Sequence, residues 1–438
     1  MLRRSVRRLL STSRPARKVD KAVEEELEGR VKVPPAPTLG EPKDRARQWP
    51  ELVPLGVMLV LTGIILFRRE DKTRRVEIKG KSFAKPKPVQ VVAVDAADVA
   101  AAAFATGGKP GRLSRVQDSD GGVRSVATTA DGVTYAVRAS DGALVSWKTG
   151  KSVAAVASAS EPLADVAATI GAPWLVGLAK SGRVYVWHAE TGALLADGVL
   201  PGGDKVSHVA AGGQHIVMLT VTGQVYTCGA NGNGQLGTGS RSNVDVAHPV
   251  PVSLPGTSGK AARVRRIAAG SRHTLLLAKD GSVWSFGHNG CMQCGQGDAT
   301  NGYYEENVLT PQRVVGVAAS SDVTCGREHS MVVQHDGTVV AFGANGVGQL
   351  GTGKIGHVNN VQKVDLDAPI AKLTCQDGHC AALTAAGGVL TWGENRYGQI
   401  GTGRRVSQKK PVRVAQVDGG LRNVTVSATA RATVVHST

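Results

Sequence analysis

The clearest structural unit in the sequence runs from residue 264 to residue 287. It reads Val264-Arg-Arg-Ile-Ala-Ala-Gly270-Ser-Arg-His273-Thr-Leu275-Leu-Leu-Ala-Lys-Asp-Gly281-Ser-Val-Trp-Ser-Phe-Gly287. Three apolar runs are separated by two turns that contain glycine. This pattern predicts a meander of short antiparallel strands.

The same unit recurs along the chain. Its second turn carries a glycine, and an aromatic residue or a cysteine follows that glycine five positions later. The pairs are Gly142 and Trp147, Gly182 and Trp187, Gly223 and Cys228, Gly281 and Phe286, Gly337 and Phe342, and Gly387 and Trp392. Successive glycines lie 40 to 58 residues apart, the interval of a propeller blade.

These pairs account for six blades, and the two ends of the chain supply a seventh. The C-terminal runs that start at Val424 and Thr433 match the inner strands of a unit. We expect residues 90–115 to complete that blade, since joining the ends closes the ring and removes free sheet edges. The predicted fold is therefore all-β, a seven-bladed β-propeller over residues 90–438 closed by its N- and C-terminal segments.

Two motifs recur within the units. Gly-x-x-His or a near relative starts at Gly212, Gly270, Gly326 and Gln376 and ends at His215, His273, His329 and His379. Gly-x-Asn-x-x-Gly-Gln-(Leu/Ile)-Gly spans 229–237, 343–351 and 393–401. These motifs resemble the regulator of chromosome condensation repeat family, whose members are seven-bladed β-propellers. The resemblance covers residues 95–438 and is specific in units three to six, because units one and two lack both motifs.

The first residues have the composition of a targeting signal. Residues 1–18 contain seven basic residues, no acidic residue and interleaved leucines and serines, which is typical of a mitochondrial presequence. A disordered basic tail is the alternative. Residues 19–51 are polar, bear prolines and predict a flexible linker.

Residues 52–67 carry no charge and predict one transmembrane helix. Trp49 on one side and Arg68 and Arg69 on the other suit the membrane interfaces. Residues 68–89 form a basic linker. The excess of positive charge on this downstream side favours a propeller in the matrix, whereas a presequence followed by a stop-transfer segment would place it in the intermembrane space. We therefore expect a single-pass protein of the mitochondrial inner membrane.

The net charge of +17 does not indicate a nucleic-acid partner. Residues 1–88 carry 22 Lys and Arg against 11 Asp and Glu, which leaves 30 against 24 for the rest of the chain. A domain that binds nucleic acid concentrates its positive charge on the folded part. The excess of positive charge therefore lies mainly in the predicted presequence and in the segments around the predicted transmembrane helix.

Several patterns invite a sharper interpretation that the repeat does not support. The spacing Gly232-x-Gly234-x-x-Gly237 matches a dinucleotide fingerprint, but a strand unit rather than a helix follows it. Cys291 and Cys294 have no second pair at zinc-finger spacing, and Cys294 aligns with Leu236 as a core residue.

The remaining cysteines and the repeated histidines also fit structural roles. Cys325 and Cys375 take the small-residue position of Ala269, and the six cysteines show no disulfide framework. The four repeated histidines lie on different blades, so they cannot converge on one ion, and we interpret them as structural. The sequence predicts no catalytic residue, no cofactor and no metal site.

Partner binding is expected in the loops that depart from the repeat, residues 239–263 and 297–312. The second loop contains Tyr303, Tyr304, Glu305 and Glu306, an aromatic and acidic group that suits protein recognition. An ordinary solvated insertion is the alternative.

The order of presequence, single span and propeller is similar to that of the fungal-type mitochondrial inner-membrane members of the family. This resemblance implies a scaffold that assists the assembly or stability of a respiratory complex, notably the cytochrome bc1 complex, through protein partners. The alternatives are guanine-nucleotide exchange on a small GTPase, the activity of the nuclear archetype, and mitochondrial ribosome or RNA binding.

Overall fold

The computed structural model describes the chain from residue 92 onward with several gaps. The described residues are 92–95, 104–105, 114–115, 123–129, 133–148, 151–153, 159–198, 200–255, 262–296, 306–356, 360–418, 424–429 and 432–437. All lie in one compact unit, Ala84–Thr438. The predicted presequence, linkers and transmembrane helix, residues 1–89, lie outside the described residues. Among the residues that the structure describes, no helix is long and apolar enough to cross a membrane.

All regular elements of the described residues are strands, so the prediction of an all-β propeller is confirmed. Sheets one to six follow the chain. Sheet one contains β4 (Val123–Thr128), β5 (Val133–Arg138), β6 (Leu144–Lys148) and β7 (Lys151–Val153), and sheet two contains β8 (Leu163–Ala168), β9 (Trp174–Ala179), β10 (Val184–His188) and β11 (Leu194–Gly198). Sheet three contains β12 (Val206–Ala211), β13 (His215–Thr220), β14 (Val225–Gly229) and β15 (Val250–Val252).

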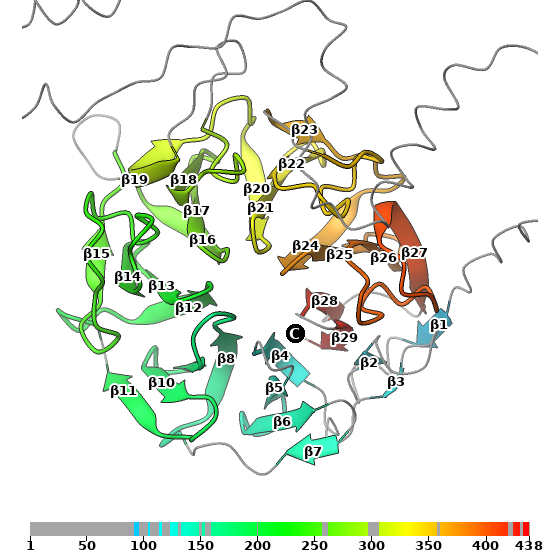
Figure 1. Ribbon diagram of the computed structural model, residues 1–438. Helices are drawn as coiled ribbons and strands as arrows, with labels where there is room; N and C mark the ends of the chain where they lie inside the picture. The colour runs from blue at the N-terminus through cyan, green and yellow to red at the C-terminus, as the bar shows by residue number, and fades with distance from the viewer. Residues whose placement is uncertain are drawn as a thin grey trace, which may run out of the picture. The chain divides into compact units, whose positions relative to one another are not determined.

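The next three sheets repeat this order. Sheet four contains β16 (Val264–Ala269), β17 (His273–Ala278), β18 (Val283–His288) and β19 (Asn307–Arg313). Sheet five contains β20 (Ser320–Cys325), β21 (His329–Gln334), β22 (Val339–Gly343) and β23 (Gln362–Lys363). Sheet six contains β24 (Ile370–Gln376), β25 (His379–Thr384), β26 (Gly388–Gly393) and β27 (Gln408–Asp418), and the sheets surround a central axis that the first strand of each one faces (Figure 1).

A further sheet, the closing sheet, joins the two ends of the described chain. β28 (Val424–Ala428) and β29 (Thr433–Ser437) pair with β2 (Phe104–Ala105) and β3 (Ser114–Arg115) in the order β28-β29-β2-β3. The closing sheet also bonds to sheet one, since Nδ1 of His436 lies 3.0 Å from the carbonyl oxygen of Val123. The expected pairing of residues near 104–115 with residues 424–437 is therefore present.

The first strand departs from the expected closure. β1 (Val92–Asp95) does not join the closing sheet but pairs in parallel with β27, from Val92 opposite Ala415 to Asp95 opposite Asp418. Every other pairing between the described strands is antiparallel. The prediction that all of residues 90–115 complete the closing blade was too broad, because β1 adds a fifth strand to sheet six.

The recurring glycine and the aromatic residue after it both have a structural reason. All six turn glycines have positive φ, between 73° and 92°, which glycine adopts without a steric cost. The aromatic residue packs on the last glycine of the preceding Gly-Gln-Leu-Gly motif. A Cβ atom on Gly237 would lie 2.9 Å from the Phe286 ring, and one on Gly351 would lie 2.9 Å from Trp392. The two patterns therefore pack adjacent sheets against each other.

Candidate functional site

The four repeated histidines are fully buried and form a ladder between sheets. Each Nε2 atom contacts a residue on the next sheet. That residue directly follows the position that is equivalent to the histidine. The pairs are His215 and Thr274 at 3.0 Å, His273 and Ser330 at 3.0 Å, His329 and Cys380 at 3.1 Å, and His379 and Thr433 at 3.4 Å. The ladder therefore crosses four consecutive sheet boundaries, from sheet three to the closing sheet.

Each hydroxyl in the ladder also donates to a carbonyl oxygen of the preceding sheet's glycine-rich loop. Thr274 donates to Gln235, Ser330 to Gln293 and Thr433 to Gln399, at 3.0, 2.7 and 3.0 Å. Because the hydroxyl proton is used there, the imidazole must donate its Nε2 proton to the hydroxyl oxygen. Nδ1 is then unprotonated, and it has no hydrogen-bond partner among the described residues.

The glycine of Gly-x-x-His is required by the imidazole itself. A Cβ atom on Gly270 would lie 2.1 Å from Cε1 of His273, and the distances at Gly212 and Gly326 are 2.2 and 2.0 Å. Sheet six has Gln376 at this position and avoids the clash with the imidazole in another way. Gln376 pairs directly with His379 in a tighter hairpin, in which Asp377 has a φ of 50°.

Burial fixes the protonation state of the ladder. It lowers the pKa of His215 and His379 to about 4, and that of His273 and His329 to about 3, because a charged imidazole is poorly solvated there. The four histidines are neutral near pH 7. Their Nε2 protons are committed to hydrogen bonds between sheets, a contact beyond the structural role at a strand turn that the sequence predicts.

The glycine-rich loop is a closed turn rather than a phosphate-binding loop. Oδ1 of Asn231 accepts from the backbone N–H of Leu236 at 3.0 Å, and its Nδ2 donates to Ser240. Asn289, Asn345 and Asn395 repeat the first of these bonds. In sheet four, Met292 has a φ of 64° where the other loops have glycine, and Cys294 is fully buried where they have Leu or Ile. The assignment of Cys294 as a core residue is confirmed.

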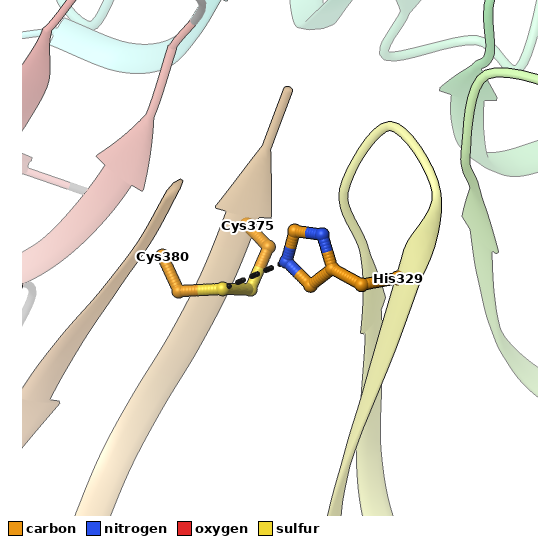
Figure 2. A group of neighbouring side chains, drawn as sticks. All are labelled: His329, Cys375 and Cys380. Carbon is orange, nitrogen blue, oxygen red and sulfur yellow. Dashed lines mark hydrogen bonds between the residues drawn. A yellow bond between two sulfur atoms is a disulfide. The ribbon is translucent and has the colours of Figure 1, made fainter. Parts of the chain in front are cut away.

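One pair of cysteines is bonded, although the spacing of the six cysteines predicts no disulfide framework. Cys375 and Cys380 face each other on β24 and β25 and form a disulfide. Figure 2 shows His329 of the neighbouring sheet with its ring beside this disulfide. The ligand atoms of the three residues lie within 4.8 Å of one another. Since both sulfur atoms are bonded to each other, neither carries the thiolate charge that metal ligation uses.

The described ends of the two loops predicted to bind partners lie side by side, because residues 307–312 of the second loop belong to β19. The backbone N–H of Gly239 donates to Leu309 at 2.9 Å, and Asn233 bonds to Asn307. Between them lies a groove of about 780 Å³. Its lining combines apolar residues with hydroxyls: Val244, Val250, Pro251, Leu254, Pro255 and Pro311, with Thr238, Ser240, Ser242, Ser253 and Thr310. We call this the loop groove.

The predicted aromatic and acidic group is only partly described. Glu306 is exposed directly before β19, and its carbonyl oxygen accepts from the backbone N–H of Asn289 at 2.6 Å. Tyr303, Tyr304 and Glu305 lie outside the described residues. The structure therefore fixes where this segment enters sheet four.

A second cavity, of about 530 Å³, lies on the central axis and is lined by the first strands of the sheets. Six of these strands have an irregularity in register at the same place, and such bulges re-aim side chains. Asp322 lies 3.9 Å from Arg266 and 3.8 Å from Lys372. Burial raises the pKa of Asp165, against the hydrogen bond from Ser125. We call this cavity the axial channel.

Fold and ladder together define a repeat β-propeller protein. The sequence profile of the RCC1-like domain matches residues 166–438, which is more than half of the chain. The chain therefore belongs to the RCC1-like domain family.

Relatives share the repeat over part of their length. The chain is 36% identical over 163 residues to the human "Probable E3 ubiquitin-protein ligase HERC3", covering 36% of this chain and 14% of that protein. It is 29% identical over 204 residues to the Arabidopsis thaliana "Ultraviolet-B receptor UVR8", covering 43% and 44%. It is 31% identical over 172 residues to the Xenopus laevis "Protein RCC2 homolog", covering 38% and 31%. The chain spans less than half the length of these relatives.

Solved structures show the same fold at low identity. Human WBSCR16 superposes with a TM-score of 0.64 at 18% identity, covering 77% of this chain and 98% of that one. Yeast RCC1 (Prp20), solved bound to Kap60, gives 0.60 at 18% identity, covering 83% and 96%.

Proposed function

We propose that this chain is a non-enzymatic scaffold that binds protein partners through the loop groove. One observation carries the proposal. The repeated histidines and the hydroxyls of the ladder are buried and hydrogen-bonded between sheets, whereas the segments that depart from the repeat line a surface groove. Histidines that are neutral and bonded between sheets are not available as general bases. The groove is free to recognise a partner.

The lining of the groove indicates the chemistry of its partner. Pro251 and Pro255 are exposed, Leu254 and Pro311 are buried, and five hydroxyl-bearing residues share the lining with them. Apolar residues with a few polar groups suit an extended peptide segment that buries apolar side chains and bonds through its backbone. Tyr303 and Tyr304 would add aromatic contacts beside Glu306.

The cellular setting of the scaffold rests on the sequence. The basic first residues and the uncharged stretch 52–67 support a single-pass protein of the mitochondrial inner membrane. We propose that it assists the assembly or stability of a respiratory complex there, the cytochrome bc1 complex first of all. The seven sheets would act as the seven blades of one closed ring, with the tether leaving from β1.

The test is affinity purification of the full-length chain from detergent-solubilised mitochondria. Thr310→Arg and Ser253→Arg place a bulky charge in the groove at exposed positions. We expect them to reduce the recovery of bc1 subunits by about tenfold, as the loss of a central contact does. Thr191→Arg, in the exposed turn between β10 and β11, is the matched control and should leave recovery unchanged.

Two results would contradict the proposal. The wild-type chain could recover no respiratory subunit above background, which would remove the client. Alternatively, both groove variants could recover the client as well as Thr191→Arg does, which would remove the groove as its binding site.

Guanine-nucleotide exchange on a small GTPase is the second candidate. It is favoured by the match of 33% identity over 152 residues to the Caenorhabditis elegans "X-linked retinitis pigmentosa GTPase regulator homolog". A Saccharomyces cerevisiae neighbour, Prp20p, was solved in a study of its binding to Gsp1p and histones. Recovery of a GTPase in place of bc1 subunits would select this function.

A further inference from the structure

The Cys375–Cys380 disulfide occupies a position that is repeated around the propeller. In each sheet, the last or next-to-last residue of the first strand lies opposite the first or second residue of the strand that follows. The pairs are Thr128 and Thr134, Ala168 and Leu175, Ala211 and Ile216, Ala269 and Thr274, Cys325 and Ser330, Cys375 and Cys380, and Ala428 and Thr433. Cysteine occupies both places only in sheet six.

Cys380 takes the place of a hydroxyl in the ladder. Thr274, Ser330 and Thr433 each accept from a histidine and donate to a glutamine carbonyl. Cys380 Sγ lies 3.1 Å from Nε2 of His329 and 3.8 Å from the carbonyl oxygen of Gln349, so it stands between the equivalent two groups. A thiol there can donate a proton as a hydroxyl does, whereas a disulfide sulfur has no proton to donate.

A second donor reaches the carbonyl oxygen of Gln349, to which Cys380 cannot donate as a disulfide. Nε1 of Trp392 donates to the carbonyl oxygen of Gln349 at 3.0 Å. The equivalent residues in sheets four and five are Phe286 and Phe342, and phenylalanine has no donor. The Gln349 carbonyl is therefore satisfied when Cys380 is oxidised, so a disulfide is compatible with a complete set of buried hydrogen bonds.

The pair is buried but borders the axial channel. Cys375 is 5% exposed and lines that cavity, while Cys380 is fully enclosed against Met331, whose Sδ lies 3.2 Å from its sulfur. A thiol that enters the channel can therefore meet Cys375 first. Cys325 lines the same channel but faces Ser330, so it has the access without the partner.

We propose that Cys375 and Cys380 form a reversible thiol–disulfide site, which reacts with thiol reductants and disulfide oxidants through the axial channel. The redox state of this site changes one rung of the ladder, the contact between His329 and Cys380. A dithiol reductant attacks Sγ of Cys375, breaks the sulfur–sulfur bond and forms a mixed disulfide, and Cys380 leaves as a thiolate that takes a proton. The second reductant thiol then attacks the mixed disulfide and releases Cys375. Two electrons and two protons pass to the protein, and the reductant becomes a disulfide. The new thiol of Cys380 donates to Gln349.

The experiment measures the state of each cysteine in the folded full-length chain. The purified protein is incubated with dithiothreitol or glutathione disulfide, separated from that reagent, and then denatured in the presence of N-ethylmaleimide, so that buried thiols are alkylated as well. After reduction, a second alkylating reagent labels the remaining cysteines, and mass spectrometry quantifies both labels. We expect Cys375 and Cys380 to change together between states. A pair that stays a dithiol under the oxidant, or stays a disulfide under dithiothreitol, would overturn the proposal.

Hydrogen exchange tests the consequence for the ladder. Reduction should change protection in residues 344–351 and 376–380, on the two sides of the rung. Cys380→Thr restores a hydroxyl and should abolish this dependence on reductant, whereas Cys325→Ser, the matched control, should respond as the wild type does. If Cys380→Thr still responded, or if exchange in the wild type were identical in both states, this pair would not control the rung.

Discussion

Nε2 of His273 lies 3.0 Å from Oγ of Ser330, a residue 57 positions later on the neighbouring sheet. The bond makes a short repeated motif into a connection between sheets. Neither partner is reachable from solvent, since both are fully buried. Histidine is a common catalytic residue, but the repeated histidines of this propeller are expected to contribute to its stability.

Replacing His273 with alanine should destabilise the fold by about 3 kcal/mol, because it removes a buried bond and leaves a cavity. The measurement is the free energy of unfolding from urea titration. Arg272 is the matched control, because it is the adjacent residue, its side chain is 44% exposed and it pairs with Glu328 at 3.1 Å. Arg272→Ala should change the free energy by less than about 0.5 kcal/mol. Equal effects of the two substitutions would contradict a structural role for His273.

Gly270→Ala should be nearly as damaging as the loss of the histidine. Its Cβ would overlap Cε1 of His273 and lie 2.7 Å from the carbonyl oxygen of Gly326, so the imidazole must leave its place. We expect a loss of about 3 kcal/mol. Gly232→Ala is the control, because nothing lies within 4 Å of its added Cβ. Thermal melting of both variants checks the comparison, and a normal melting temperature for Gly270→Ala would show that the contact can relax.

Stability should fall in mild acid. The ladder histidines have pKa values of about 3 to 4 in the folded state, against about 6.5 in the unfolded chain. Below pH 6.5 the unfolded state binds protons that the folded state does not. Each histidine's contribution, fully present above pH 6.5, is lost by about 1.4 kcal/mol per pH unit until the folded pKa is reached.

Urea titrations at pH 7, 6 and 5 measure this dependence. His379→Gln should reduce its slope by at most about a quarter, since one of the four ladder histidines is removed and His208 and His288 also have lowered pKa values. His379 is the suitable choice because its bond to Thr433, at 3.4 Å, is the longest of the four. A free energy of unfolding that stayed constant from pH 7 to pH 5 would rule out buried neutral histidines.

Removing residues 424–438 should unfold the whole propeller rather than one sheet. The deletion takes away β28 and β29, leaving β2 paired only with β3 and sheet one without the bond from His436. Removing residues 1–89 is the control, since every described strand remains. Circular dichroism and melting should show loss of the cooperative transition only in the first variant. A C-terminally truncated chain that melted normally would mean that the ring does not need its closing sheet.

The strands, their turns and the histidines could be predicted because their signals are local and repeated. A turn glycine at positive φ and an aromatic residue five positions later belong to one hairpin, so each unit carries its own description. The burial of Cys294 followed from alignment with Leu236 for the same reason. Repetition also exposed the pairing of the two ends.

The features that were missed depend on contacts that single units do not contain. The loop groove arises because Thr310 of one unit meets residues 237–255 of another. β1 pairs through four residues that have no counterpart in the repeat. The disulfide is the exception, because Cys375 and Cys380 belong to one unit and face each other on adjacent strands, a pairing that the register of the other units predicts.

The parallel pairing of β1 with β27 has a mechanical consequence. β1 is the first described strand after the N-terminal segment, so tension from a tether would reach the propeller through it. A pull along the axis of β1 loads the four-residue pairing with β27 in shear, which strains all its hydrogen bonds together instead of opening them one by one. Force would then spread into the five strands of sheet six before it reached the closing sheet. Under such a load the closing sheet would keep its strand pairing.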